Sequence, residues 1–107
     1  MKVLVVSRLG LHTRFIEELR KYGVTDFEDY FIRRNGWKYI DDIDKTAKEK
    51  GCEAIAIIAN FRVALELLAR GFKRIFVITP KYWTPTEIIT GELYVIEGEI
   101  KAVVKSV

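Results

Sequence analysis

The chain alternates short apolar runs with stripes of apolar residues at helical spacing. Runs rich in β-branched residues predict buried strands at Lys2–Ser7, Glu53–Ala59 and Lys73–Thr79, the last ended by Pro80. Phe27–Arg34 could form a further strand. Asn35 and Gly36 together are a strong tight-turn signal, so Trp37–Ile40 is interpreted as a short return strand.

Two apolar helices are predicted between these strands. Thr13–Tyr22 carries its apolar residues on one helical face and ends at Gly23. Asn60 is a suitable N-cap for the second apolar helix, and Gly71 is its expected end. Each helix follows a predicted strand directly, as expected for repeated strand–helix units.

Two polar segments also carry helix signals. Asp41 or Asp42 can cap a polar helix that runs to Lys50, with Gly51 as its stop. Thr84–Glu87 combines a cap residue, Pro at the first helical position and Glu three residues after the Thr. This combination predicts a single helical turn.

The C-terminal segment is interpreted as a hairpin, because Glu92–Ile96 and Glu99–Val104 flank Gly98. The order strand–helix–strand–helix–strand–helix–strand predicts the α/β class. We expect one three-layer, Rossmann-like domain over residues 1–107, with a mainly parallel sheet. The terminal hairpin is expected to extend one edge of that sheet or to build a dimer contact.

The composition fits one small globular domain. The 107 residues are 50% hydrophobic, which excludes intrinsic disorder. The longest apolar run, Ala54–Ala59, is far too short to span a membrane, and the start of the chain lacks the features of a signal peptide. One His and one Cys exclude a disulfide and a His- or Cys-based zinc site. We therefore expect a soluble, cytoplasmic protein without a metal ion or cofactor.

The net charge of +3 is unevenly distributed along the chain. Residues 61–85 carry 5 basic residues and 1 acidic residue, whereas residues 41–60 and 86–107 each sum to −2. This is not the uniform basicity of a protein that coats duplex DNA or RNA. It suits a local anionic ligand, and ordinary surface scatter explains it equally well.

Residues with useful chemistry follow three of the predicted strands. The carboxyl ends of parallel strands meet at one edge of a sheet, where ligands bind near the switch point of the strand order. Cations, helix N-termini and aromatic rings gathered there suit a ligand that combines phosphate with bases. The candidate residues are Ser7, Arg8 and His12 after the first strand, Asn60, Phe61 and Arg62 after the Glu53–Ala59 strand, and Lys81, Tyr82 and Trp83 after the Lys73–Thr79 strand.

Each candidate also has a purely structural interpretation. Ser7 would be a turn residue and Asn60 a helix cap. Arg62 would form an ordinary ion pair along its own helix. The lone His12 would be inert, and the aromatic pair after the third strand would pack at a sheet edge or a subunit interface.

Two segments carry a recognisable pattern. The first is the strand that ends in Val-Val-Ser7-Arg8, followed by a loop and a helix that starts near Thr13. The second is Ala64–Arg74, a helix that ends in an Ala-Arg-Gly turn and leads into a strand. Both resemble the small stand-alone CRISPR-associated proteins of type III systems. Leu9 stands where that family has His directly after Ser-Arg.

The resemblance implies a Rossmann-like core and a ring nuclease, which binds and cleaves a cyclic oligoadenylate second messenger. A homodimer suits such a ligand, because each subunit presents the same loops to half of a symmetric ring. Cleavage would need no metal, since the ribose 2′-hydroxyl can attack the adjacent phosphate when the protein holds it in line. Arg8 and Arg62 are then the candidates for charge stabilisation. Ser7 and Asn60 would orient the phosphate or ribose, and His12 would be the acid or base.

Two other functions stay open from the residues alone. The first is a non-catalytic nucleotide-binding or sensing module with the same pocket. The second is a small archaeal or viral interaction protein that works through its hairpin edge and has no nucleotide ligand.

Overall fold

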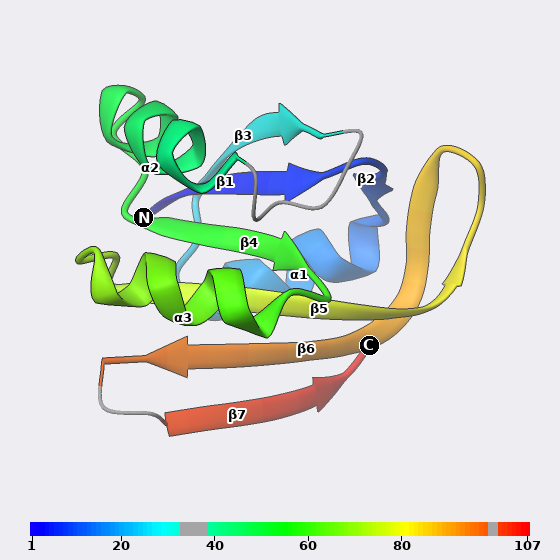
Figure 1. Ribbon diagram of the computed structural model, residues 1–107. Coiled ribbons are helices and arrows are strands. Elements are labelled where there is room, and N and C mark those ends of the chain that lie inside the picture. The colour runs from blue at the N-terminus through cyan, green and yellow to red at the C-terminus, as the bar shows by residue number, and fades with distance from the viewer. Residues whose placement is uncertain (33–38, 99–100) are drawn as a thin grey trace.

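The chain forms a mixed α/β fold (Figure 1). The computed structural model describes residues 1–32, 39–98 and 101–107, and within them three helices accompany a seven-stranded mixed sheet. The helices are α1 (Thr13–Lys21), α2 (Ile40–Glu49) and α3 (Phe61–Ala69). The strands are β1 (Lys2–Ser7), β2 (Gly10–Leu11), β3 (Asp26–Phe31), β4 (Ala54–Ile58), β5 (Arg74–Trp83), β6 (Glu87–Glu97) and β7 (Lys101–Ser106). The predicted α/β class is confirmed.

The sheet has a parallel part and an antiparallel part. Its strand order is β2-β6-β5-β4-β1-β3, with β7 also paired to β6. β3, β1, β4 and β5 are parallel neighbours. β6 runs antiparallel to both β5 and β7, and the short β2 pairs in parallel with the start of β6. The last strands therefore add an antiparallel extension to a parallel core.

Helices cover both faces of the parallel strands. Phe15 and Leu19 of α1 are fully buried against one face of the sheet, together with Phe76. Ile43 of α2 and Leu67 of α3 are fully buried against the other face. Figure 1 shows α2 and α3 in front of the sheet and α1 behind it. None of the helices in the described residues is long and apolar enough to cross a membrane.

The ends of α1 and α3 lie where the sequence predicts them. Gly23 and Gly71 follow these helices with φ values of 87° and 100°, a left-handed conformation that costs other residues more than glycine. Asn60 caps α3, because its Oδ1 accepts a hydrogen bond from the Val63 amide at 3.0 Å. Local sequence signals thus determine where α1 ends and where α3 begins and ends.

The start of α2 differs from the prediction. Its N-cap is Tyr39, so Ile40 begins the helix and does not belong to a return strand. Asp41 and Asp42 lie in the first turn, where a carboxylate stabilises the helix by its interaction with the positive end of the helix dipole. The predicted turn at residues 35–36 and the rest of the predicted return strand, residues 37–38, lie outside the described residues.

β5 is longer than predicted, because Pro80 does not end it. The strand continues to Trp83, with register shifts against β6 on both sides of Tyr82. Pro80 lacks an amide hydrogen, and the first shift follows it directly, where proline is tolerated in a sheet. Its partner is Gly91, which allows the two backbones to approach closely.

The predicted helical turn at Thr84–Glu87 is also wrong. The Thr84 amide donates to the Glu87 carbonyl at 2.8 Å, and the Glu87 amide donates to Thr84 Oγ1 at 3.1 Å. These bonds close a turn between β5 and β6. We call residues 81–90 the arm, because this hairpin extends beyond the Pro80–Gly91 pair and bends toward the end of β1 (Figure 1).

Candidate functional site

The carboxyl ends of the parallel strands meet at one edge of the sheet. Val6 of β1 is the register partner of Ile57 in β4, and Ile58 is the partner of Ile78 in β5. Ser7, Asn60 and Pro80 therefore lie at the same edge of the parallel strands, as predicted, although β5 itself continues past Pro80. β1 lies between β3 and β4 in the sheet. Among the four parallel strands, the chain passes from β1 to β3 on one side and then crosses to β4 on the other. The boundary between β1 and β4 is therefore a switch point of the strand order.

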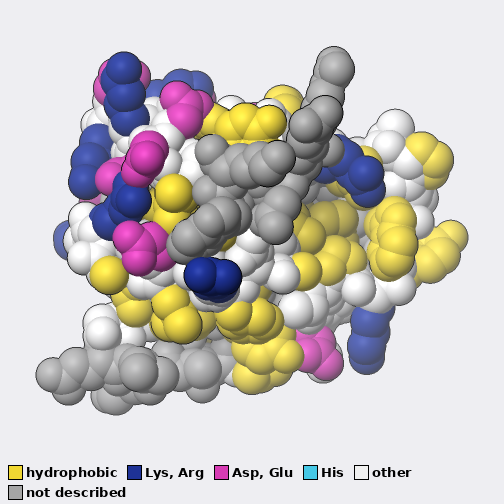
Figure 2. Space-filling view, viewed as in Figure 1, with side chains coloured by type: hydrophobic (Ala, Val, Ile, Leu, Met, Phe, Trp, Pro, Cys, Tyr) yellow, Lys and Arg dark blue, Asp and Glu magenta, His cyan; other side chains and the backbone are white. Residues whose placement is uncertain are grey.

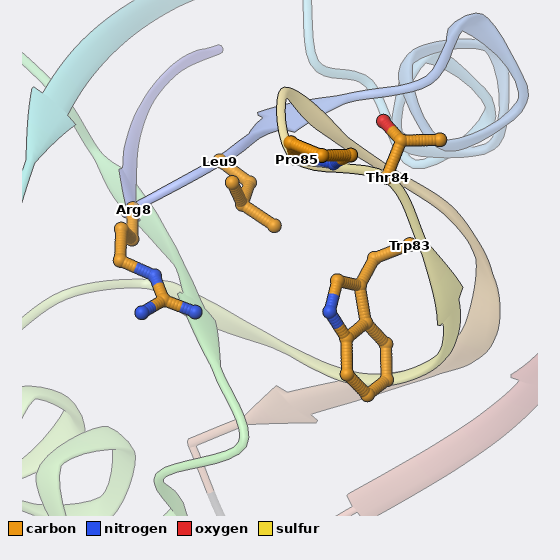
Figure 3. Close-up of a pocket in the computed structure, with 5 residues that line it drawn as sticks. All are labelled: Arg8, Leu9, Trp83, Thr84 and Pro85. Atoms are coloured by element: carbon orange, nitrogen blue, oxygen red, sulfur yellow. The ribbon is translucent and has the colours of Figure 1, made fainter.

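A pocket opens beside this edge, between the loop after β1 and the tip of the arm (Figure 3). Its volume is about 470 Å³, and it is wide open to solvent. Figure 3 shows Arg8 and Trp83 on opposite sides of Leu9, with the guanidinium and the indole projecting in the same direction. The lining residues are Arg8, Leu9, Trp83, Thr84 and Pro85.

Arg8 brings an uncompensated positive charge to this pocket. Its side chain is exposed, and it forms no hydrogen bond or ion pair with any residue in the described ranges 1–32, 39–98 and 101–107. Trp83, across the pocket, keeps 55% of its surface exposed. A free guanidinium beside an accessible indole can bind an anion and stack a flat ring.

Many charges at the opposite edge of the sheet are paired. Lys2 and Lys50 lie 3.2 and 3.5 Å from the carboxylate of Glu28, and the pKa of Glu28 is lowered chiefly by its hydrogen bond from Lys2. Arg74 lies 2.5 Å from Glu97. Figure 2 shows charges of both signs crowded at this end and hydrophobic side chains gathered over the arm. The contrast marks the pocket end as the better place for an anionic ligand.

Ser7 is buried and holds the pocket loop. Its Oγ donates to the Leu9 carbonyl at 2.6 Å and accepts from the Leu9 amide at 3.0 Å. Both hydrogen bonds close a turn around Arg8. The structural interpretation of Ser7 as a turn residue therefore describes what its hydroxyl does here.

His12 is the N-cap of α1. Its Nδ1 accepts a hydrogen bond from the Arg14 amide at 3.1 Å, which assigns the ring proton of the neutral imidazole to Nε2. Its own amide donates to the Ile88 carbonyl at 2.9 Å. His12 does not line the pocket.

The residues after β4 lie at the same edge but outside the pocket lining. Phe61 packs edge-to-face against Tyr94, with ring centroids 5.0 Å apart. Asn60 is occupied as a helix cap, and Arg62 is exposed on the first turn of α3. Tyr94 donates a hydrogen bond to Glu92 at 2.6 Å, which is the main reason that its pKa is raised.

Lys81 and Tyr82 are exposed on the arm and do not line the pocket, although Trp83 does. Sequence analysis missed three lining residues, Leu9, Thr84 and Pro85. Leu9 stands directly after Arg8 in the loop that follows β1. Its position next to a candidate residue was the one sequence signal that could have identified it. Thr84 and Pro85 carry a helix-start signal in the sequence, so the sequence does not indicate that they form the arm tip.

Ala59 stores backbone strain just before Asn60. Its φ is 46°, in the left-handed region that residues with a Cβ rarely adopt. Replacing Ala59 by Gly should stabilise the protein by about 0.5–1 kcal/mol, because the strain relieved exceeds the entropy lost on folding. Ala69→Gly, at an exposed helical position, should instead destabilise it by about 0.5–1 kcal/mol. Urea unfolding of both variants checks this, and equal losses in the two would refute it.

Comparisons with known proteins bring no further assignment. No protein-family model matches the chain, and no curated protein matches it either.

Proposed function

We propose that the protein binds a cyclic oligoadenylate, with the Arg8–Trp83 pocket holding one nucleotide of the ring. The observation that carries the proposal is the Arg8 guanidinium, which faces the pocket without a protein partner among the described residues. A phosphate would accept hydrogen bonds from it. The exposed indole of Trp83 would stack on the base.

The strand order supports this choice of site. β3, β1, β4 and β5 have the order 2-1-3-4 when only the parallel strands are numbered, as in doubly wound folds that bind ligands at the first switch point. We infer from this order, and from the helices on both faces, that the core is Rossmann-like. The resemblance of the Ser7-Arg8 and Ala64–Arg74 segments to type III CRISPR-associated ring nucleases points to the same ligand class.

A second copy of the chain completes the proposed site. The pocket is open and of a size for one small ligand. A ring of several nucleotides extends beyond it, and a two-fold homodimer offers the ring two identical pockets. The expected stoichiometry is therefore one ring for two chains.

The geometry supports binding more directly than cleavage. Cleavage would proceed by attack of a ribose 2′-oxygen on the adjacent phosphorus while the bond to the 5′-oxygen breaks. The 2′-hydroxyl proton passes to solvent, the 5′-oxygen takes up a proton, and the product ends in a 2′,3′-cyclic phosphate. Ser7 Oγ and His12 Nδ1 are both engaged in local hydrogen bonds, which leaves Arg8 as the residue best placed to stabilise the charge.

Titration calorimetry with cyclic oligoadenylates of three to six nucleotides tests the proposal. We expect at least one ring to bind with a stoichiometry of one per two chains, and linear oligoadenylate of the same length to bind more weakly. Any cleavage should persist in excess EDTA, because the 2′-hydroxyl mechanism needs no metal. If no ring binds at high micromolar concentration, the proposal is wrong and the interaction-protein alternative is favoured.

A further inference from the structure

The loop that carries Arg8 and Leu9 is held at both of its ends. At its start, the Ser7 hydroxyl bonds to the amide and the carbonyl of Leu9, at 3.0 and 2.6 Å. At its end, the Gly10 amide donates to the Thr86 carbonyl at 3.0 Å. Each contact lies next to a residue that lines the pocket.

The second end of the loop depends on His12. Its amide donates to the Ile88 carbonyl at 2.9 Å, which completes the bridge between β2 and the start of β6. Its imidazole Nδ1 accepts from the Arg14 amide at 3.1 Å, and its carbonyl accepts from the Phe15 amide at 2.9 Å. Both bonds to α1 fix the backbone of His12 in an extended conformation, with φ −61° and ψ 152°.

The two walls of the pocket meet through this bridge. One wall is Arg8 and Leu9, and the other is the arm tip, Trp83–Pro85. Two carbonyls accept the bridging hydrogen bonds, that of Thr86, directly after the arm tip, and that of Ile88, two residues further along the chain. The spacing of the two backbone segments that carry Arg8 and Trp83 therefore depends on how firmly β2 is held against β6.

We infer that His12 is a positioning residue, which holds the Arg8–Leu9 wall against the arm through its N-cap hydrogen bond. The ligand in this inference rests on the proposed function. The claim that His12 holds the loop in place rests on its hydrogen bonds alone. It assigns His12 a different role from the acid or base that its residue type suggests. The positioning role requires a hydrogen-bond acceptor on the side chain of residue 12. It does not require a side chain that transfers a proton.

Asparagine separates the two roles. Asn is among the best N-cap acceptors, and its amide does not transfer a proton at neutral pH. His12→Asn should therefore behave like the wild type, whereas His12→Ala should lose the cap. Thr13→Ala is the matched control, because it changes the adjacent exposed residue and leaves the cap acceptor in place.

The first measurement is amide hydrogen exchange of the free protein, which needs no ligand. His12→Ala should raise the exchange rates of the amides at positions 10, 12 and 14 by roughly fivefold, the effect expected for one lost N-cap bond. His12→Asn and Thr13→Ala should leave them near the wild-type rates. Unchanged exchange in His12→Ala would overturn the inference, whatever the ligand of the protein.

The second measurement is affinity for the tightest cyclic oligoadenylate of the wild type. We expect His12→Ala to bind it roughly fivefold more weakly and His12→Asn to bind it and, where cleavage is measured, to cleave it as the wild type does. Normal binding with lost cleavage in His12→Asn would establish proton transfer and overturn the inference. Failure of the wild type to bind any ring would refute the proposed function, while the exchange measurement still decides the role of His12.

Discussion

Replacing Arg8 by Ala is expected to weaken the binding of a cyclic oligoadenylate by roughly 10- to 150-fold. The guanidinium has no protein partner in the described part of the chain, so its hydrogen bonds to a phosphate would be gained on binding. A charge-assisted hydrogen bond contributes about 1.5–3 kcal/mol, which is the stated loss of affinity. The stability of the free protein should hardly change, because the substitution removes no hydrogen bond or ion pair within residues 1–32, 39–98 and 101–107.

Calorimetry at two salt concentrations checks this expectation. Lys45→Ala is the matched control, since it removes one positive charge from α2, where Lys45 lies 3.9 Å from Glu49. The control should bind as the wild type does, and the Arg8→Ala variant should show a weaker salt dependence. If both variants bind equally well, Arg8 does not contact the ligand and the pocket is misassigned.

Replacing Gly91 by Ala is expected to destabilise the protein by about 2–3 kcal/mol. A Cβ at this position would lie 2.4 Å from the Thr79 carbonyl oxygen and 3.1 Å from Pro80 Cα. These are backbone atoms of the paired strand, which cannot move aside as a flexible side chain can. Gly91 also exchanges two hydrogen bonds with Val107, of 3.0 and 2.8 Å, so relief in the other direction is restricted as well.

Thermal unfolding measures this loss directly. The expected decrease in Tm is roughly 10–20 °C for a domain of this size. Gly98→Ala serves as the control, because a Cβ there meets nothing within 4 Å. It should change stability by less than about 1 kcal/mol. A Gly91→Ala protein as stable as the Gly98→Ala protein would show that β5 and β6 do not approach closely at this pair.

The features that the sequence predicts well are local. Asn60, Gly23 and Gly71 act on the turn in which they stand, so the ends of α1 and α3 agree with expectation. The buried strands are equally local patterns, and β1 has the predicted bounds Lys2–Ser7. The parallel register then follows from the strand–helix order, which brings the expected segments to one edge.

The arm depends on residues far apart in the chain. Pro80 ends a strand in most local contexts, but here its partner Gly91 allows β5 to continue through a bend. Thr84 and Pro85 carry a helix signal, and the antiparallel pairing of β5 with β6 turns the same residues into a hairpin tip. The sequence therefore predicts one lining residue on each side of the pocket, Arg8 on the loop and Trp83 on the arm, and misses Leu9, Thr84 and Pro85.

The β2–β6 bridge also has a consequence for how the protein folds. It joins Gly10 to Glu87, so residues 11–86 of the 107-residue chain lie within the loop that this contact closes. Contacts of such large sequence separation form late, since much chain entropy is lost before they stabilise the fold. We expect the parallel strands and their helices to assemble first and the pocket to close last. A refolding protein should then regain its buried core before it regains any ligand affinity.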